Sequence, residues 1–514
     1  MVGRESAATR PRAAVGWDWT SDLGCLTIIL GFFGLRLLTA AFLGFGVDES
    51  YSLSISRDLS LSYFDHPPLH QWITHYAEAL LGLTHSVRIP FILMFGFSGW
   101  AMFLLTRRLF GRTAAFWAVL ALNLSGFFSF SAGSWVLPDG PLTLALLACA
   151  ATLARVLFPN EAEQRASWRH WLLVGFWLGM ALLSKYQALL FAIGCGLSLW
   201  SLARGRAALR GPGPYLAILV ALAVFAPVII WNAQHDWASI AFQSARRGAA
   251  HGLRPSAVLT ALGGEMALLL PWLFLPLSLG AIRAARRGPG DGEAWLCLML
   301  AAPTIVVFSL IPMLGAPGLP HWSMSGWLML FPLLGRMLAK AAEKRTWPRK
   351  WAVGSGLALL GLWAFATSDA LTAWPLRTFP TTFKTDPTVE LMDWVPLRTE
   401  LARRGLLSNR TAFVVTLNWM EAGKIDTALQ GNTPILLFAK DARQYAYRER
   451  AGGTIGEDAL IIGSPKNVAR QLSAVLPLFQ SIEQLPSVFL GRGGTSEIEL
   501  EVFRAHQMAK LYVP

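Results

Sequence analysis

The chain has 514 residues, of which 54% are hydrophobic and only 15% are charged, and its mean hydropathy is +0.45. A soluble protein of this size carries roughly 25% charged residues, so the composition excludes an ordinary soluble enzyme and predicts a polytopic membrane protein. The net charge is +13. The Lys and Arg residues cluster in short loops between apolar runs, as in loops that face anionic cytoplasmic lipid, so we exclude nucleic acid as a partner.

Residues 1–22 are predicted to form a cytoplasmic tail. The apolar run that follows is too long for the hydrophobic region of a signal peptide and lacks a clear cleavage site, so we expect an uncleaved first helix. The cysteines argue against disulfides and zinc, because all four lie inside apolar runs without metal-ligand spacing: Cys25, Cys149, Cys195 and Cys297.

About eleven membrane-spanning helices are expected, because runs of near twenty mostly apolar residues recur along the chain. They lie near residues 23–45, 87–106, 113–132, 139–158, 168–184, 186–203, 214–231, 256–282, 293–314, 322–340 and 350–368. The sequence therefore predicts a transmembrane domain over residues 23–369, with a catalytic first outer loop over residues 46–86.

The orientation follows from the distribution of Lys and Arg. One set of alternate loops is rich in them, at residues 107–112, 165–169, 204–210, 283–287 and 340–350. The positive-inside rule places this set in the cytoplasm together with the N-terminus. The loop after the first helix then faces outward, as do the segments after residues 132, 184, 231 and 314.

The sequence changes character after about residue 370. Apolar runs shorten to strand length at residues 411–415 and 459–462, a helix-like segment covers 467–478, and alternating strands are indicated between about 487 and 503. We predict a small soluble α/β domain over residues 370–514, on the extracytoplasmic face because the helix count is odd. No internal repeat is evident, which weakens a transporter built on inverted repeats.

Polar side chains gather in five segments on the outward side. The first apolar helix ends in two adjacent carboxylates, Asp48 and Glu49, and the same loop contains Asp65 and His66. The other segments contribute Asp139, Lys185, Tyr186, His235, Asp236, Arg246, Arg247 and His321. Acids, imidazoles and cations at one membrane face suit a negatively charged, lipid-linked substrate and a hydroxyl or amine acceptor.

Simpler interpretations exist for most of these residues. Asp139 could cap its helix, and Lys185 could extend toward lipid headgroups. His66 belongs to a set of histidines without a compact metal-ligand arrangement. Two adjacent acids at a helix end would repel each other, which favours a function for Asp48. Glu265 lies inside an apolar span, where a carboxylate is costly; it is either functional or paired with an Asn or Arg of a neighbouring helix.

The motifs resemble those of polyprenyl-phosphate-dependent GT-C glycosyltransferases. The residues that carry the resemblance are Asp48-Glu49, Tyr63-Phe64-Asp65-His66-Pro67-Pro68-Leu69, Pro138-Asp139-Gly140-Pro141-Leu142, Leu183-Ser184-Lys185-Tyr186 and the stretch 227–237. The bacterial aminoarabinose transferases of lipid A, which are similar to protein O-mannosyltransferases, form the branch with the nearest pattern. The resemblance covers roughly residues 23–340. His66 stands where that branch has Lys, and Ser50 follows the acidic pair, so the sugar stays open.

This resemblance implies transfer of one sugar, a hexose or pentose, from an undecaprenyl-type phosphate carrier to an extracytoplasmic acceptor, with inversion at the anomeric carbon. Asp48 then matches the acid that deprotonates or orients the acceptor, and Asp65-His66 matches a pair near the sugar and phosphate. We assign Glu49, Asp65 and Asp139 to the catalytic set with Asp48. We assign to donor binding His66, Lys185, Tyr186, Arg246, Arg247, His235, Asp236 and His321.

The acceptor is expected to be a glycolipid or glycan of the bacterial envelope, such as lipid A or lipopolysaccharide, with a protein as the lesser alternative. No metal site is predicted, although a divalent cation stays open because some GT-C enzymes use one. A second reading is a polyprenyl-linked lipid flippase or transporter, and a third is a non-catalytic scaffold. Under each of these readings the chain is expected in the bacterial inner membrane, with its site facing the periplasm.

Overall fold

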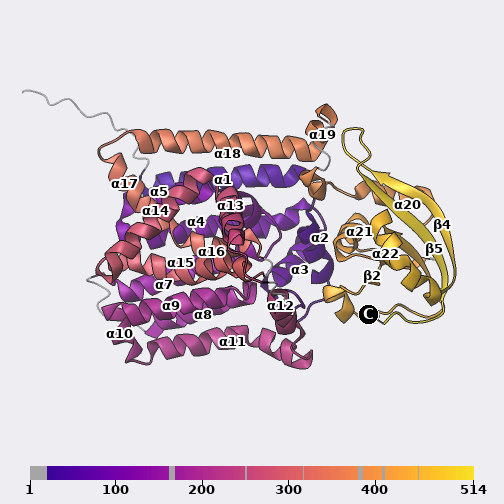
Figure 1. Cartoon of the computed structure of the whole chain (residues 1–514), viewed down its shortest axis with the longest axis horizontal. Helices are drawn as coiled ribbons and strands as arrows, with labels where there is room; N and C mark the ends of the chain where they lie inside the picture. Colours follow the sequence, from indigo (N-terminus) through magenta and orange to yellow (C-terminus); the bar gives the residue numbers. More distant parts are fainter. Residues whose placement is uncertain are drawn as a thin grey trace, which may run out of the picture.

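The computed structural model describes residues 20–160, 168–248, 252–315, 318–379, 386–407, 411–449 and 451–513. A bundle of helices forms one end of the molecule and a small domain that contains the only sheet of the described chain forms the other (Figure 1). The helices as far as the end of the bundle are α1 (Asp22–Phe42), α2 (Val47–Ser56), α3 (Leu69–Leu81), α4 (Ile89–Phe110), α5 (Arg112–Asn123), α6 (Gly126–Ser134), α7 (Asp139–Leu157), α8 (Trp168–Ser184), α9 (Ala188–Ser201), α10 (Ala203–Leu209), α11 (Gly213–Gln234), α12 (Ala238–Gly248), α13 (Ser256–Leu269), α14 (Pro271–Arg287), α15 (Gly292–Leu310), α16 (Met324–Leu328), α17 (Phe331–Ala342) and α18 (Trp347–Thr372).

Helices occupy all eleven predicted spans, but not all of them as straight rods. Among the described residues, six helices are long and apolar enough to cross a membrane, or up to nine if each bent pair is one span. The predicted span at 113–132 is broken into α5 and α6, which meet at 75°, and the span at 256–282 is broken into α13 and α14, which meet at 114°. The chain is a multi-pass membrane protein, and the number eleven stays a prediction.

The break between α13 and α14 has a local cause. Pro271 lacks an amide hydrogen and disfavours helical backbone at the residue before it. Leu270 is not helical, with φ +77° and ψ 138°. The sequence predicted one continuous helix here because its hydropathy is continuous across the proline.

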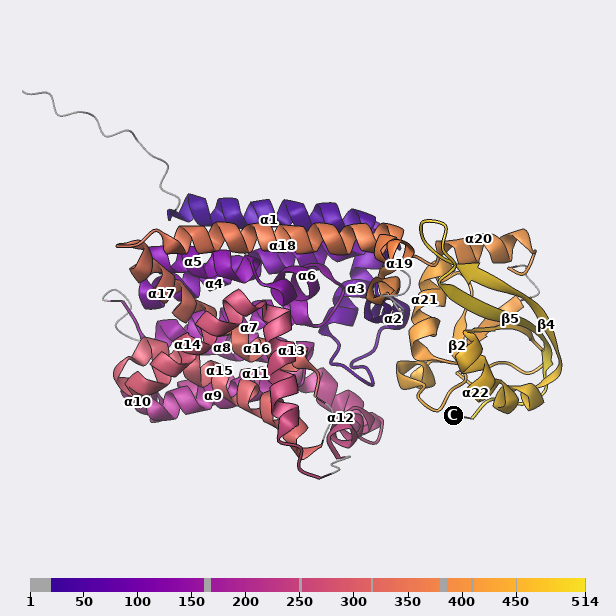
Figure 2. The ribbon, with the colours of Figure 1, turned by 45° about the horizontal axis from the view of Figure 1, so that its top comes forward.

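The first and last long helices of the bundle run beside each other. Figures 1 and 2 both show α1 and α18 along the same side of the bundle. Leu359 and Trp363 of α18 pack with Phe32 and Leu35 of α1 in one apolar cluster. The chain therefore returns to its starting side before it enters the small domain.

The small domain is α/β. It contains α19 (Trp374–Thr378), α20 (Val395–Arg403), β1 (Thr411–Thr416), α21 (Trp419–Ala428), β2 (Ile435–Leu437), β3 (Asp458–Gly463), α22 (Pro465–Val475), β4 (Phe479–Leu490) and β5 (Ile498–Met508). The strand order is β2-β1-β3-β5-β4, with β1 parallel to both β2 and β3 and the last two pairings antiparallel. This confirms the predicted fold class, a helical membrane protein with a small C-terminal α/β domain.

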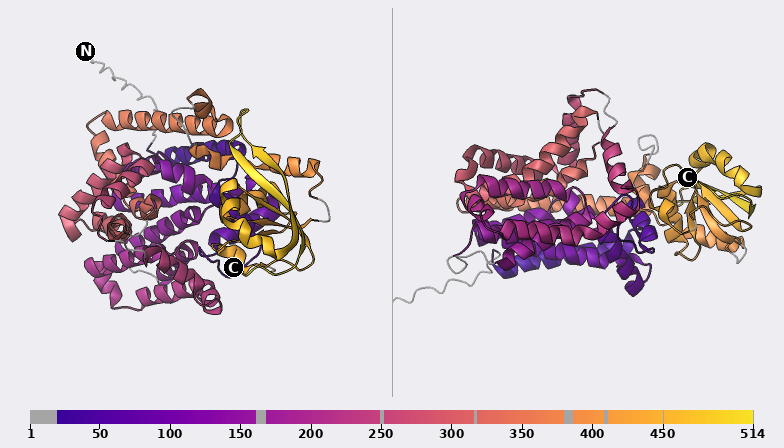
Figure 3. Two further views of the ribbon diagram at one scale, coloured as in Figure 1. Left: turned by 45° about the vertical axis from the view of Figure 1, so that its right-hand side comes forward. Right: turned by 90° about the horizontal axis from the view of Figure 1, so that it is seen from below.

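The two faces of the sheet are covered differently. On one face, α22 packs on Val415 and Ile461. On the other face α21 packs, and its apolar cluster also includes Tyr51, Ile55 and Tyr63 from the first outer loop. Figure 1 shows α2 beside this domain, at the boundary with the bundle, and the right-hand view of Figure 3 shows the small domain at one end of the bundle. The first outer loop is therefore part of the core of the small domain.

Gly423 explains how closely these parts approach. A Cβ atom at this position of α21 would lie 2.6 Å from the backbone nitrogen of Tyr51 in α2. Glycine is thus required because two helix backbones touch here. Lys424, the next residue, donates to the backbone carbonyls of Phe45 and Met392 and ties the small domain to the end of the first helix.

Candidate active site

A cavity of about 990 Å³ lies where the first outer loop, the helical bundle and the small domain meet. Six of the twelve predicted site residues line it: Asp48, Asp65, His66, Asp139, Lys185 and His321. They come from four of the five outward segments identified in the sequence. The cavity also contains residues that were not predicted, among them Tyr51, His70, Trp419, Met420 and Arg443.

Asp48 stands in the first turn of α2. Its side chain is exposed to the cavity, and within the described part of the chain it has no hydrogen bond or ion pair. Burial by the surrounding protein raises the pKa of Asp48, which the negative charges of Asp65 and Glu390 also favour and the cation of Arg443 opposes. A carboxylate without a partner and with a raised pKa is suited to accept a proton.

Glu49 has a different environment although it is the next residue. Both its oxygens accept hydrogen bonds from Arg88, at 2.8 and 2.6 Å, and the backbone amides of Gly46 and Val136 donate to it at 2.9 and 3.0 Å. Burial alone would raise its pKa, but Arg88 and these hydrogen bonds hold the pKa of Glu49 below its usual value. Glu49 is absent from the cavity wall; its observed contacts join α2 to the start of α4 and to the segment before α7.

Asp65 is buried in the loop between α2 and α3, where two groups contact its carboxylate. The Tyr51 hydroxyl donates to it at 3.2 Å, and the Arg443 guanidinium lies 3.5 Å away. Its backbone carbonyl accepts from Gln243 of α12 at 2.7 Å. Asp65 therefore links the first outer loop to α12 and to the small domain.

Asp139 and Lys185 form a buried ion pair across the cavity wall. The Lys185 ammonium donates to both oxygens of Asp139, at 2.9 and 3.0 Å. Asp139 begins α7 and Lys185 directly follows α8. Both side chains line the cavity, so neither simpler interpretation, a helix cap or a lysine extended to lipid headgroups, describes the observed contact.

Two imidazoles lie side by side in the cavity. The rings of His66 and His70 are 5.8 Å apart in an edge-to-face arrangement. Burial lowers the pKa of His66, and it lowers that of His70 well below its ordinary value. Both shifts favour the neutral imidazole. Nδ1 of His70 is buried and has no partner in the described part of the protein.

Three further predicted residues, Tyr186, His235 and Asp236, do not line the cavity. The Tyr186 hydroxyl bonds Ser239 at 2.6 Å, and His235 stacks on Trp231 with ring centroids 4.2 Å apart. Asp236 adopts a left-handed backbone in the turn between α11 and α12. Arg246 and Arg247 belong to α12, but their side chains lie outside the described residues. Their assignment to donor binding stays a prediction.

Arg443 is the residue that sequence reasoning missed. It comes from the loop after β2, has a left-handed backbone with φ +47°, and lies 3.6 Å above the ring of Trp419. Left-handed backbone is unfavourable for a side chain of this size and is found where surrounding contacts hold it. No local pattern in the sequence marks Arg443, because its position depends on the docking of the small domain.

Part of the cavity lining is apolar and includes residues at two of the helix breaks. Gly126, Phe127 and Phe130 follow the break between α5 and α6, and Leu268 and Leu270 border the break between α13 and α14. Leu359 and Leu362 of α18 complete this apolar wall. The cavity therefore combines charged groups with a hydrocarbon-like surface.

Glu265 lies behind this wall in α13. It accepts hydrogen bonds from Ser309 at 2.8 Å and from the indole nitrogen of Trp327 at 3.0 Å. Of the two interpretations of Glu265, pairing with an Asn or Arg is not seen among the described residues, where Ser309 and Trp327 are the partners. In the part of the chain that the structure describes, no group of three His, Cys, Asp or Glu side chains is placed to hold a metal ion.

Comparison with known proteins identifies related sequences. Residues 65–231 match the family model of dolichyl-phosphate-mannose-protein mannosyltransferases. The chain is 24% identical over 330 residues to the lipid A galacturonosyltransferase RgtD of Rhizobium johnstonii, a match that covers 63% of this chain and 66% of that protein. The chain thus spans about two thirds of the curated relative it matches.

Solved structures share the fold over almost the whole chain. ArnT of Cupriavidus metallidurans, in a crystal structure with bound undecaprenyl phosphate, superposes with a TM-score of 0.60 at 15% identity, covering 94% of this chain and 98% of that chain. The oligosaccharyltransferase of Archaeoglobus fulgidus gives a TM-score of 0.51 at 13% identity, covering 93% of this chain and 72% of that one. The resemblance to bacterial GT-C glycosyltransferases of the aminoarabinose-transferase and protein O-mannosyltransferase type is confirmed.

Proposed function

We propose that this chain is an integral-membrane glycosyltransferase that moves a sugar from a polyprenyl phosphate to an envelope glycolipid of the lipid A type. One observation carries the proposal. The unpaired carboxylate of Asp48 shares a cavity with two cations, Lys185 and Arg443, and with an apolar wall. A lipid-linked phosphate sugar needs cations for its phosphate, a hydrocarbon surface for its chain and a base near its anomeric carbon.

The proposed reaction is a single displacement at the anomeric carbon. An acceptor hydroxyl attacks that carbon, its proton passes to Asp48, and the bond to the phosphate oxygen breaks with its electron pair leaving on the polyprenyl phosphate. Attack from the face opposite the leaving group inverts the configuration. The raised pKa of Asp48 makes its carboxylate a stronger proton acceptor than an ordinary aspartate.

The other cavity residues have supporting roles in this scheme. Lys185 and Arg443 balance the charge that develops on the leaving phosphate. Asp139 and Asp65 hold these cations in position through the contacts described above. The neutral ring of His66 can donate one hydrogen bond to the sugar or phosphate without adding charge.

We further propose the following arrangement in the cell. Residues 1–22 form a cytoplasmic tail, residues 23–369 the transmembrane domain and residues 370–514 a periplasmic domain of a bacterial inner-membrane protein. The asymmetry of Lys and Arg among the loops supports this orientation. A transporter would instead place ionisable groups along a path through the membrane, whereas the charged cavity residues described here lie at the end that contacts the small domain (Figure 2).

The proposal is tested by mass spectrometry of envelope glycolipids from cells with and without the chain. An added mass of one sugar on lipid A, present only with the active chain, is expected. A uronic acid, an amino pentose and a neutral hexose give different added masses, so the same spectrum identifies the sugar. Transport of a labelled polyprenyl-linked lipid into sealed vesicles without any glycosylated product would favour the flippase alternative.

The assignment of the base is tested with Asp48→Asn in purified full-length protein. Asp58→Asn is a matched control, because Asp58 lies on the same outer loop and its exposed side chain pairs with Arg448 outside the cavity wall. Asp48→Asn is expected to abolish transfer while the control keeps it. Full activity of Asp48→Asn would refute the role of Asp48.

A further inference from the structure

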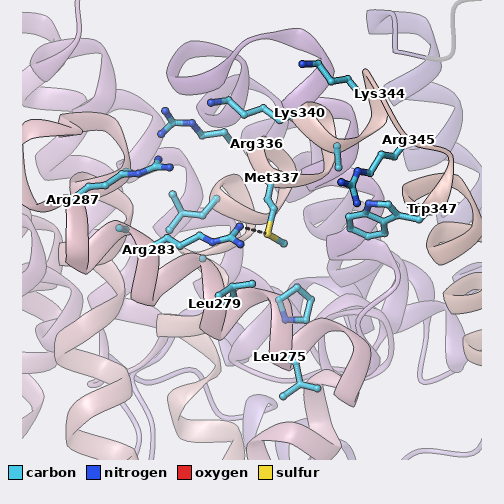
Figure 4. A pocket seen from close by; sticks show the side chains of 16 residues that line it. Leu275, Leu279, Arg283, Arg287, Arg336, Met337, Lys340, Lys344, Arg345 and Trp347 are labelled. Atoms are coloured by element: carbon cyan, nitrogen blue, oxygen red, sulfur yellow. Dashed lines mark hydrogen bonds between the residues drawn. The ribbon is translucent and has the colours of Figure 1, made fainter.

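A second large pocket lies at the end of the helical bundle away from the small domain. It has a volume of about 650 Å³ and opens between α14, α17 and the start of α18 (Figure 4). Six of its side chains are cationic: Arg283, Arg287, Arg336, Lys340, Lys344 and Arg345. None of the residues that line it is acidic. The proposed sugar transfer uses none of them.

The two helices present stripes whose character changes along their length. On α14, Leu275, Leu279, Arg283 and Arg287 follow at intervals of four residues and share one face. Leu333 and Met337 on α17 are likewise followed by Lys340 and, in the turn after the helix, Lys344. Figure 4 shows the leucines at one end of the pocket and the cations at the other. The pocket is therefore amphiphilic.

The positive charge in the pocket is only partly balanced. Asp291, which lies beside the pocket, pairs with Arg287 at 2.9 Å and with Arg336 at 2.7 Å. Arg283 donates to the sulfur of Met337, and in the described chain no carboxylate contacts Arg283, Lys340, Lys344 or Arg345. Cations near helix C-termini are favoured by the helix dipole, but that preference does not require four of them around an open pocket.

We propose that this pocket binds an anionic membrane phospholipid, with the phosphate among Arg283, Lys340 and Lys344 and an acyl chain against Leu275 and Leu279. The apolar wall argues for a lipid over free phosphate, because inorganic phosphate has no hydrocarbon to place there. Basic pockets between membrane helices on the cytoplasmic side suit such headgroups. The bound lipid would join α14 to α17 and α18. This inference does not depend on the proposed transferase activity.

The test measures lipid binding by full-length protein in detergent micelles. Native mass spectrometry and thermal melting would compare phosphatidylglycerol with phosphatidylcholine, for the natural chain and for Arg283→Gln/Lys340→Gln/Lys344→Gln. These three side chains are exposed or contact only a sulfur, so the triple variant should fold. Phosphatidylglycerol is expected to bind and stabilise the natural chain, and the variant should bind it about a hundredfold more weakly, since each cation near an anionic lipid contributes about a factor of five.

The matched control is Arg286→Gln/Arg349→Gln/Lys350→Gln. It removes the same charge from the same end of the bundle at positions that do not line the pocket, and it is expected to keep the natural affinity. An equal loss of phosphatidylglycerol affinity in both triple variants would refute the proposed binding pocket, because it would show that only the overall positive charge matters. So would equal binding of phosphatidylcholine, equal stabilisation by inorganic phosphate, or binding of undecaprenyl phosphate without phosphatidylglycerol.

Discussion

The two large pockets of this protein use cations in opposite ways. In the cavity beside the small domain, Lys185 is buried and held by Asp139, and Arg443 lies between Asp65 and Trp419. In the pocket at the other end, four of the six cations, Arg283, Lys340, Lys344 and Arg345, are exposed and have no carboxylate partner in the described chain. Cations held by fixed carboxylates keep one geometry, as a transition state requires. Unpaired, flexible cations suit a mobile headgroup. The pairing of charges, more than their number, separates a reaction site from a binding site.

The largest expected combined effect on stability and rate comes from breaking the buried pair. Lys185→Met removes the cation and leaves Asp139 without a partner. Breaking a buried pair in this way costs about 3 to 5 kcal/mol of stability, and losing one charge-stabilising group lowers kcat by about 10² to 10³. Thermal melting and single-turnover transfer assays measure the two effects.

A second variant separates stability from chemistry. The double substitution Lys185→Met/Asp139→Leu replaces the pair with apolar side chains and should recover much of the stability, but not the activity. Recovery of activity would show that the pair only supports the structure, and the contrast between the two pockets would fail.

The adjacent acids should respond in opposite directions. Glu49→Gln breaks the hydrogen-bonded pair with Arg88 and is expected to lower stability by about 3 to 5 kcal/mol. The Glu49→Gln molecules that fold should keep the natural kcat. Asp48→Asn removes a carboxylate whose pKa is raised by burial; since its charged form is disfavoured in the folded state, stability at neutral pH should be kept or increased. Thermal melting of the natural chain and of both variants tests whether the two changes in stability have opposite signs.

Arg443 should affect the pH dependence of transfer. Only ionised Asp48 accepts a proton, so the rate falls as pH drops through the pKa of Asp48. Arg443 opposes the rise of that pKa; Arg443→Gln should therefore move the acidic limb of the kcat/KM profile to higher pH, with about a tenfold loss in rate. Arg443→Lys keeps the charge and should leave the limb nearer its natural position. If the acidic limb of the kcat/KM profile stays at its natural pH in both variants, Arg443 does not act on Asp48.

The smallest expected effect concerns the joint between the small domain and the first loop. Gly423→Ala would place a methyl group 2.6 Å from Tyr51 of α2 and cost about 1 to 3 kcal/mol through forced backbone shifts. A misaligned small domain also moves Arg443, so Km for the donor should rise more than kcat falls. Alanine at the exposed Gly354 of α18, where nothing lies within 4 Å of the added carbon, is the control.

Part of the active site could be predicted because its residues occur as local motifs. Asp48, Asp139, Lys185 and His321 lie near the ends of apolar runs, and Asp65 and His66 belong to a motif in the first outer loop. Charge asymmetry between the loops assigned all of them to one side. Glu49 could not be separated from Asp48 in this way. Whether a carboxylate meets Arg88 or an open cavity depends on which face of α2 it occupies.

By itself, the sequence determined that the chain is a membrane protein with a helical bundle, a small α/β domain and one polar face. Hydropathy and charge decide these features, because each acts over a single segment. Only the tertiary structure decided that α5–α6 and α13–α14 break beside the cavity, that Arg443 enters it, and that Lys185 pairs with Asp139. The contact of Lys185 with Asp139 joins residues 46 positions apart, and Arg443 reaches Asp65 from a far more distant part of the chain. No local pattern specifies which distant side chains the packing of the helices and the small domain brings together.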